Sequence, residues 1–436
     1  MNMKKIILLS SIVALLSACG GSGNGELIGV QNRNIWNPTD PYGMVFIPQG
    51  SFNMGPSDQD VPFANVSQSK TVSVGAFYMD ETEITNNEYR QFTTWVRDSI
   101  AHFHLGDNGV DGHLIEEDKY GNYLETPKIN WNTRIRWDDE EEREILGEIM
   151  YLPEHERLDG KREFDTRKYI YKYQILDINA ASVKSKREGN APGKTDRSEF
   201  LSTIKVNIFP DTLTWSHDYS YSFNEPLTKS YFFHPAFDDY PVVGVNWKQA
   251  TAFSKWRSKM MNSFLRRTKQ PTLPEFRLPT ESEWEYASRG GLDASPYPWG
   301  GPYTRNIKGC FLANFKPLRG NYVADGGLRT IKTASYNPNG YGLYDMAGNV
   351  AEWTSNAYDE SAFSYSHDMN MDRHYNAKEE DHAVLKRKSI RGGSWKDIAY
   401  FIQTGTRTFE YQDTAKSYVG FRNVVDFLGR DKQDFQ

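Results

Sequence analysis

The chain has 436 residues, of which 25% are charged, 38% hydrophobic and 14% aromatic. This aromatic content is too high for an intrinsically disordered chain, and a net charge of -6 gives no electrostatic basis for binding a nucleic-acid backbone. Two cysteines cannot build a disulfide-rich secreted scaffold. The length fits two or three average domains, or one large domain that carries an insertion.

The N-terminus has the pattern of a secretory signal, which we predict over residues 1–18. Lys4 and Lys5 precede an apolar run from Ile6 to Leu16, which is too short for a membrane-spanning helix of about 20 apolar residues. The Leu-Ser-Ala-Cys sequence that ends at Cys19 resembles a bacterial lipobox, in which the cysteine is acylated after cleavage. Two or three acyl chains, at about 0.8 kcal/mol per buried methylene, would anchor the chain stably. An ordinary signal with an accidental cysteine is the alternative.

Residues 19–40 are predicted to form a flexible tether, because glycines dominate directly after Cys19. No acidic cluster follows the cysteine, so we expect an outer-membrane anchor with the folded body on the periplasmic side. If Cys19 carries lipid, Cys310 is the one cysteine left. We expect it to be a buried free thiol.

The first elements of the mature chain are predicted from short hydrophobic patterns. An apolar run over 44–47 predicts a buried strand, and the alternation over 72–76 predicts a second one. A capping box begins at Thr85, and apolar residues then recur at helical spacing, which predicts a helix over about 85–100.

Residues 102–237 show weak periodicity and are predicted to form a large, partly ordered insertion. They contain an acidic block at 138–142 and a basic stretch at 184–187, which we expect to be solvated.

Regular patterns resume near Pro241. Residues 242–245 predict a strand, and Asn246 caps a helix whose apolar positions step by three or four, namely Ala250, Phe253, Trp256, Met260 and Phe264. Thr280 and Glu283 predict a second capped helix, which Gly290 ends. Its first turn carries carboxylates that complement the helix dipole, namely Glu281, Glu283 and Glu285. An Asn-Pro-Asn-Gly turn then predicts a positive φ at Gly340.

Six stretches resemble, in order, motifs of the formylglycine-generating enzyme (sulfatase-modifying factor) family. They are Ile47–Gly55, Asp80–Asn86, Arg277–Glu285, Gly342–Trp353, Arg391–Trp395 and Gly420–Arg422. The resemblance implies an α+β fold, similar to that of C-type lectins, with much irregular structure. This domain would comprise residues 41–101 and 238–425, with the insertion 102–237 inside it and a tail at 426–436.

The resemblance also implies what catalysis would need. Oxidases of this family bind copper through two cysteines shortly after the Arg-Gly-Gly-Ser-Trp motif, since Cu(I) favours thiolates. Residues 396–407 contain no cysteine, and the 9 histidines do not show the His-x3-His-x-Glu pattern of the family's iron-binding branches. His102 and His104, two residues apart, are a weak metal pattern. We therefore predict a non-catalytic body without a catalytic cofactor.

Structural calcium is a further implication of the resemblance, because the family holds it with side-chain and backbone oxygens. The first set of ligands would be Asp345, Gly348, Val350 and Glu352. The second set would be Asn314, the Phe315 carbonyl and Asp325. The alternative is that these residues satisfy turn backbones without metal.

Within the family, the segments 58–61, 79–92 and 95–100 are similar to the GldK and PorK lipoproteins. This similarity implies a structural ring subunit of the type IX protein secretion and gliding motility machinery. Its partners would be a GldN/PorN-like periplasmic protein, other components of that machinery and further copies of itself. Aromatic residues of the insertion are candidates for partner contacts, namely Trp131, Trp137, Tyr171, Tyr173 and Trp215. Alternatively, these side chains pack the insertion's own core.

Two other functions stay open at this point. One is an oxidase of the formylglycine-generating type with an unrecognised site. The other is a calcium-dependent glycan-binding lipoprotein.

Overall fold

The computed structural model describes residues 38–56, 69–183, 197–222, 225–321, 323–324, 327–368 and 371–429. The predicted signal peptide, Cys19 and most of the tether lie outside these residues. The last tether residues, 38–40, are described, and Asp40 accepts a hydrogen bond from the Tyr78 hydroxyl. No helix in the described ranges is long and apolar enough to cross a membrane.

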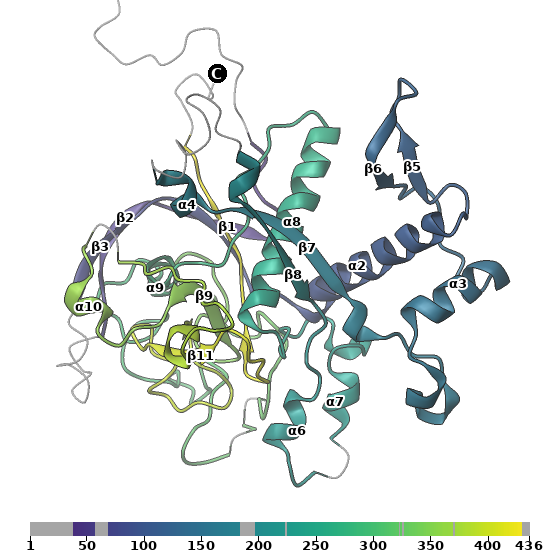
Figure 1. Ribbon diagram of the computed structural model, residues 1–436. Helices are drawn as coiled ribbons and strands as arrows, with labels where there is room; N and C mark the ends of the chain where they lie inside the picture. Colours follow the sequence, from purple (N-terminus) through teal and green to yellow (C-terminus); the bar gives the residue numbers. More distant parts are fainter. Residues whose placement is uncertain are drawn as a thin grey trace, which may run out of the picture. The chain divides into compact units, whose positions relative to one another are not determined.

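Among the described residues, two sheets have more than two strands, and β1 of the first and β9 and β11 of the second are labelled in Figure 1. The first has the antiparallel order β1–β4–β13, with β1 at Met44–Ile47, β4 at Phe77–Asp80 and β13 at Val424–Asp426. The second has the order β11–β10–β9–β12, with strands at Thr408–Tyr411, Arg387–Arg391, Ala351–Ala357 and Val419–Gly420. In the second sheet β12 runs parallel to β9, and the other pairs are antiparallel.

Three antiparallel ribbons complete the described strands. They are β2–β3 (Gly50–Met54 and Lys70–Val74), β5–β6 (Leu114–Glu117 and Tyr123–Ile129) and β7–β8 (Ile170–Leu176 and Leu201–Asn207). The α-helices are α2 (Asn86–Asp107), α3 (Glu140–Met150), α4 (Ile178–Ser182), α6 (Thr214–Asp218), α7 (Pro226–Ser230), α8 (Trp247–Arg267), α9 (Glu281–Arg289) and α10 (Ala362–Tyr365). Short 3-10 turns lie at Glu154–Glu156, Leu158–Gly160, Thr166–Lys168, Arg197–Phe200, Pro235–Phe237 and Ala383–Lys386. The predicted α+β fold with much irregular structure is confirmed.

The predicted helix starts are confirmed, because each depends on a local capping box. Thr85, Asn246 and Thr280 each accept a backbone N–H from the third residue of the helix that follows. The side chain of that third residue accepts the cap's own N–H in return. Helix α2 continues to Asp107, beyond the predicted end near residue 100.

Four local expectations are corrected. The run 242–245 is not a strand, because Gly244 has φ +74° and its backbone bonds to Asp211 and Lys416 instead of a strand ladder. Gly340 does not have a positive φ, and glycine is needed there because a Cβ would lie 2.3 Å from the carbonyl oxygen of Gly290. Strand β1 is not buried along its whole length as predicted, because Ile47 is its only buried residue. Met260 and Phe264, in the last turns of α8, are exposed, and Leu265 is the buried apolar residue there instead.

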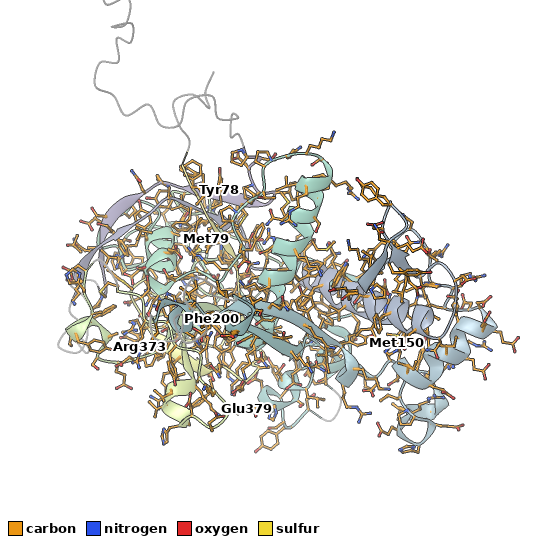
Figure 2. The ribbon with its side chains drawn as sticks, turned by 45° about the horizontal axis from the view of Figure 1, so that its top comes forward. Tyr78, Met79, Met150, Phe200, Arg373 and Glu379 are labelled. Atoms are coloured by element: carbon orange, nitrogen blue, oxygen red, sulfur yellow. The ribbon has the colours of Figure 1, made fainter. Side chains whose placement is uncertain are left out.

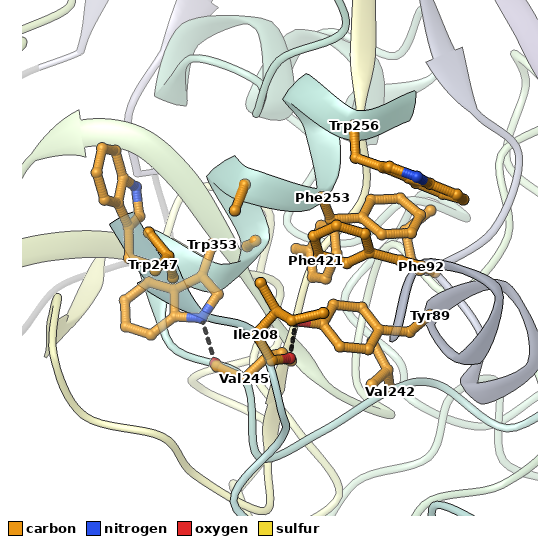
Figure 3. Close-up of a cluster of buried hydrophobic side chains, with 14 of the residues drawn as sticks. Tyr89, Phe92, Ile208, Val242, Val245, Trp247, Phe253, Trp256, Trp353 and Phe421 are labelled. Carbon is orange, nitrogen blue, oxygen red and sulfur yellow. Dashed lines mark hydrogen bonds between the residues drawn. The ribbon is translucent and has the colours of Figure 1, made fainter. Parts of the chain in front are cut away.

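The largest core joins the family motifs to the predicted insertion (Figure 3). Tyr89 of α2 stacks on Phe253 of α8, with ring centroids 5.6 Å apart. Its hydroxyl donates a hydrogen bond of 2.9 Å to the Ile208 carbonyl, just after β8. Further buried members come from residues 102–237, namely Tyr169, Tyr171, Val206 and Phe232. These residues therefore share one core with the rest of the domain.

A smaller apolar cluster fixes helix α3 to the far end of α2. Met150 at the end of α3, labelled in Figure 2, packs with Leu146 against Ala101 and Leu105. The part of α2 beyond residue 100 therefore serves as the support on which the first half of the predicted insertion folds.

Candidate functional site

The loop after β10, residues 392–407, is where the family resemblance places catalytic thiols. Here the Asp397 carboxylate accepts hydrogen bonds from the N–H and hydroxyl of Ser394, at 2.9 and 2.6 Å. Ile402 is fully buried in an apolar cluster with Tyr297, Phe311, Ala313, Phe315 and Ala347. This loop therefore contains a turn that the Asp397 carboxylate closes, followed by the buried apolar side chain of Ile402.

Cys310 is exposed, which corrects the expectation of a buried thiol. It lies in a turn in which its N–H donates to the Asn306 side chain and its carbonyl accepts from the Asn306 N–H. Arg305 and Phe311 close the turn through a β-bridge. The hydrogen bonds of this turn keep the segment at the surface, and Cys310 is exposed with it although a free thiol is usually buried.

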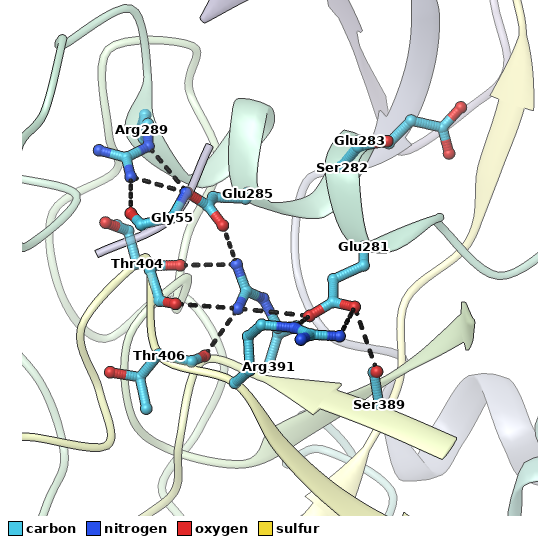
Figure 4. A network of polar contacts seen from close by, with 12 residues as sticks. Gly55, Glu281, Ser282, Glu283, Glu285, Arg289, Ser389, Arg391, Thr404 and Thr406 are labelled. Carbon is cyan, nitrogen blue, oxygen red and sulfur yellow. Dashed lines mark hydrogen bonds and ion pairs between the residues drawn. The ribbon is translucent and has the colours of Figure 1, made fainter. Parts of the chain in front are cut away.

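Glutamates of helix α9 enter a buried arginine network (Figure 4). Arg391 forms ion pairs with Glu285 and with Glu281, the latter at 3.5 Å. Arg289 and Arg407 pair with the same two carboxylates, at 2.7 and 2.5 Å. The expected position in the first turn of the helix is confirmed for Glu281 and Glu283, and Glu283 also forms the capping box.

This network ties α9 to the loop that lacks the thiols. The Arg391 guanidinium also donates to the carbonyl oxygens of Thr404, Gly405 and Thr406. Burial alone would raise the pKa of Glu281, but Arg407 and Arg391 hold that pKa below its usual value. Glu281 is thus an ionised partner of Arg407 and Arg391.

A second buried cluster contains three carboxylates and one arginine. Arg422 binds Glu352 in a bidentate pair, with N···O distances of 2.7 and 2.6 Å. Glu83 accepts from the Val350 N–H and from the Asn349 side chain, at 3.1 and 2.7 Å.

Asp345 is the third acid of this cluster. One of its carboxylate oxygens accepts from the Ala334 N–H at 2.7 Å, and the other is buried without a partner among the described residues. Its φ is +55°, a left-handed conformation that few residues other than glycine adopt.

The charges of this cluster are unbalanced. Burial raises the pKa of Glu83 well above its usual value, and the nearby Asp345 and Glu352 raise it further. Burial also raises the pKa of Asp345 to about 6. One guanidinium cannot neutralise three carboxylates, so the cluster favours an additional positive charge, either a proton or a bound cation.

The predicted calcium ligands fit a cation only in part. Asp345 offers one free oxygen, but both oxygens of Glu352 already accept hydrogen bonds from Arg422 or Trp284. Asn314 is buried, and its carbonyl accepts the Asn349 N–H at 2.8 Å. Asp325 lies outside the described residues. In the described ranges, no three His, Cys, Asp or Glu side chains converge as a metal cluster.

The five aromatic partner candidates occupy different environments. Trp215 is 1% exposed and Tyr171 6%, and both pack in the core, so they offer little surface to a partner. Trp137 and Tyr173 are half-buried. Trp131 is 46% exposed and stacks on Trp95, with ring centroids 5.2 Å apart.

Sequence reasoning missed two features of these clusters. His102 pairs with His113 rather than His104, with the two Nδ1 atoms 2.8 Å apart in the interior. The three-carboxylate cluster joins Glu83 to residues 345–352 and to Arg422. All of them lie in motifs recognised in the sequence, and no local signal shows that these motifs meet.

Comparisons with known proteins give the following matches. The family model described as the sulfatase-modifying factor enzyme 1-like domain matches residues 33–159 and 160–427. A formylglycine-generating enzyme of Bos taurus is 24% identical over 401 residues, which are 90% of this chain and 76% of that protein. An inactive C-alpha-formylglycine-generating enzyme 2 of Bos taurus is 33% identical over 190 residues, 42% of this chain and half (50%) of that protein. The solved structure of PvdO from Pseudomonas aeruginosa is similar over 88% of this chain and 94% of that chain, with 17% identity and a TM-score of 0.43.

Proposed function

Since the chain belongs to the sulfatase-modifying factor enzyme 1-like family, we propose that it is a non-catalytic, lipid-anchored structural member of that family. One observation carries the proposal. Residues 396–407, which follow the Arg-Gly-Gly-Ser-Trp motif, contain no cysteine, and within them Asp397 accepts hydrogen bonds from Ser394 and Ile402 is buried in an apolar cluster. The Arg391 guanidinium also donates to the carbonyl oxygens of Thr404 and Thr406, which fixes the backbone of this loop. One relative of this chain has a name that describes it as inactive.

The finer proposal is a structural ring subunit of type IX protein secretion and gliding motility, on the periplasmic side of the outer membrane. The similarity of segments 58–61, 79–92 and 95–100 to GldK and PorK lipoproteins supports it, and so does the lipobox at Cys19. The partners are then a GldN/PorN-like periplasmic protein and further copies of this chain. The exposed Trp131 and the half-buried Trp137 and Tyr173 remain candidates for these contacts.

Replacing the lipobox cysteine tests the anchor. We expect Cys19→Ala to move the protein from the outer-membrane fraction to the soluble periplasmic fraction, because the acyl chains supply the membrane affinity. Immunoblots of fractionated cells measure this change, and the same cells, crosslinked first, should give contacts to a second copy and to a periplasmic partner.

The matched control is Cys310→Ala, which should leave the fractionation unchanged. Cys19→Ala protein that stays in the outer-membrane fraction of cells without the partner would contradict the lipid anchor. Crosslinks to neither a second copy nor a periplasmic protein would contradict the ring role.

We also propose that Asp345 takes part in a structural calcium site. Its unpartnered oxygen and the excess of carboxylates support this proposal. The backbone carbonyls of Gly348 and Val350 would add oxygen ligands, as a hard cation requires, and Glu352 would join them while keeping its hydrogen bonds from Arg422. Calcium would supply positive charge there and brace the loop, with no part in chemistry.

Calcium in the millimolar range should raise the thermal midpoint of the wild type at neutral pH, relative to the same protein in chelator. Asp345→Gly should lose that response, because it removes the carboxylate oxygens while glycine tolerates the positive φ at this position. Differential scanning fluorimetry measures both, with magnesium as the ion control. An equal response of the variant and the wild type would place the calcium elsewhere.

A further inference from the structure

A groove of about 590 Å³ lies between the β7–β8 ribbon and helix α8. Four consecutive residues of β7, 171–174, line one side, and Thr203 of β8 adds to it. The α8 side is lined by Lys255, Ser258, Lys259, Asn262, Ser263 and Arg266. Neighbouring residues of a strand point to opposite faces, so a groove that touches four in a row runs along the strand's edge.

The register of the ribbon shows which backbone groups face this groove. The Ile208 N–H donates to the Tyr169 carbonyl, and the Asp177 N–H donates to the Phe200 carbonyl. These bonds belong to the same ladder as the pairs from Ile170↔Asn207 to Leu176↔Leu201. In an antiparallel ladder the bonded pairs alternate, so residues 171, 173 and 175 bond to β8. The N–H and C=O groups of Lys172 and Gln174 therefore point away from β8.

That outer edge of β7 is an unpaired strand edge. Among the described residues β7 pairs with β8 alone. The opposite edge of the ribbon is partly covered, because the Gln249 side chain donates to the Asn207 carbonyl at 3.1 Å. An unpaired edge offers a row of donors and acceptors on which another strand can pair.

The groove is positively charged. It is lined by Lys172, Lys255, Lys259 and Arg266, against the single acid Glu275. Glu275 is paired with Lys255. Lys172, Lys259 and Arg266 are exposed and form no ion pair within the described ranges. The Lys259 ammonium instead lies 5.3 Å from the centre of the Trp95 ring.

We propose that this groove binds an extended acidic segment of a partner protein, which adds as a strand to the outer edge of β7. The Lys172 and Gln174 backbone would supply affinity, and the cations of α8 would select carboxylates. The chain's own segment 184–196 carries four basic residues and two acidic ones, so its charge repels the groove. The acidic block of the chain at 138–142 leads into helix α3, so it is not an extended segment that could add to β7.

The proposal goes beyond the scaffold role and does not need the membrane anchor. Binding is therefore measured on the purified full-length chain in detergent, where a failed membrane fractionation has no influence on the result.

The probe is a fluorescein-labelled peptide of about ten residues that alternates glutamate with threonine, followed by fluorescence anisotropy. We expect Lys259→Glu with Arg266→Glu to weaken binding by at least about tenfold, because two charge contacts are reversed. Gln174→Pro should also weaken binding, since it removes an outward N–H without breaking a ladder bond to β8. Lys205→Pro, at the opposite edge, is the matched control and should bind like the wild type.

Two results would overturn the proposal. A peptide with lysine in place of glutamate that binds equally well would show that charge is not recognised. Loss of binding in the charge-reversed variant, with wild-type affinity in a folded Gln174→Pro variant, would show an anion site without strand addition. Both α8 positions are exposed, so the charge-reversed protein is expected to keep its fold, which unfolding curves verify.

Discussion

Replacing Arg422 by methionine is expected to lower the free energy of unfolding by about 3–5 kcal/mol at neutral pH, because removing one partner of a buried pair leaves the other charge unpaired. Arg422 is fully buried and is bound to Glu352 through two hydrogen bonds. It also donates to the backbone carbonyls of Asp80 and Tyr344, which would lose a donor as well. Urea denaturation measures the change.

The stability that Arg422→Met loses relative to the wild type should depend on pH. Asp345 has a folded-state pKa of about 6, raised by burial, and Arg422 now holds that value down. An acid with a raised folded-state pKa stabilises the fold below its unfolded pKa, near 4, and loses that contribution as the pH rises through the folded value. Without Arg422 the folded-state pKa rises further, so the variant should recover stability as the pH falls from 7 towards 5.

The matched control is Arg373→Met, which removes an arginine that is 40% exposed and paired with Asp359. Its cost should stay below about 1 kcal/mol, as for other exposed pairs. If the two variants lose equal stability, or if the Arg422→Met deficit grows on acidification, the unbalanced carboxylate cluster does not have the energetic role inferred for it.

Trp215→Ala is expected to cost about 3–5 kcal/mol, the usual loss for a large buried aromatic residue. Trp215 comes from the predicted insertion, but its ring packs on Tyr231 and on Trp395 of the motif at 391–395, with centroids 4.9 and 6.0 Å apart. Val243 and Val350 share the cluster. Loss of this ring therefore destabilises the whole domain, and deletion of residues 102–237 would remove part of its core.

Trp131→Ala provides the comparison within the same stretch of chain. Trp131 is 46% exposed, so its loss should cost clearly less than that of Trp215. Chemical denaturation of both variants measures the difference in free energy of unfolding, and each variant is expected to unfold in one cooperative transition. A separate early transition in Trp215→Ala, with the remainder unchanged, would instead show that residues 102–237 unfold independently.

The local parts of this structure could be predicted from the sequence, because their causes are local. The capping boxes at Thr85, Asn246 and Thr280 bring donor and acceptor together within four residues, so the helix starts follow from the pattern. The strand predicted at 242–245 failed for a non-local reason. Gly244 has a positive φ that lets its backbone bond to Asp211 and Lys416, and nothing near it in the sequence indicates those partners.

The site was predictable in composition but not in arrangement. The lack of cysteine in 396–407 is visible in the sequence, whereas the burial of Ile402 and the clamp by Arg391 are not. Glu83 and Arg422 are separated by more than three hundred residues, and only the folded topology places both beside Asp345. The groove at β7 depends on a register that weak periodicity does not reveal.

The strand order β1–β4–β13 has a consequence for how the chain is made. Strand β4, buried at all four positions, lies between β1 and a strand that ends at Asp426. The central strand of this sheet therefore lacks one neighbour until synthesis has reached Asp426, more than three hundred residues after β4. Pairing across such a long separation carries a high loop-closure cost, which slows folding. A nascent chain cannot complete this sheet before then, and truncation before residue 424 would leave β4 with an unpaired edge on which another chain can pair.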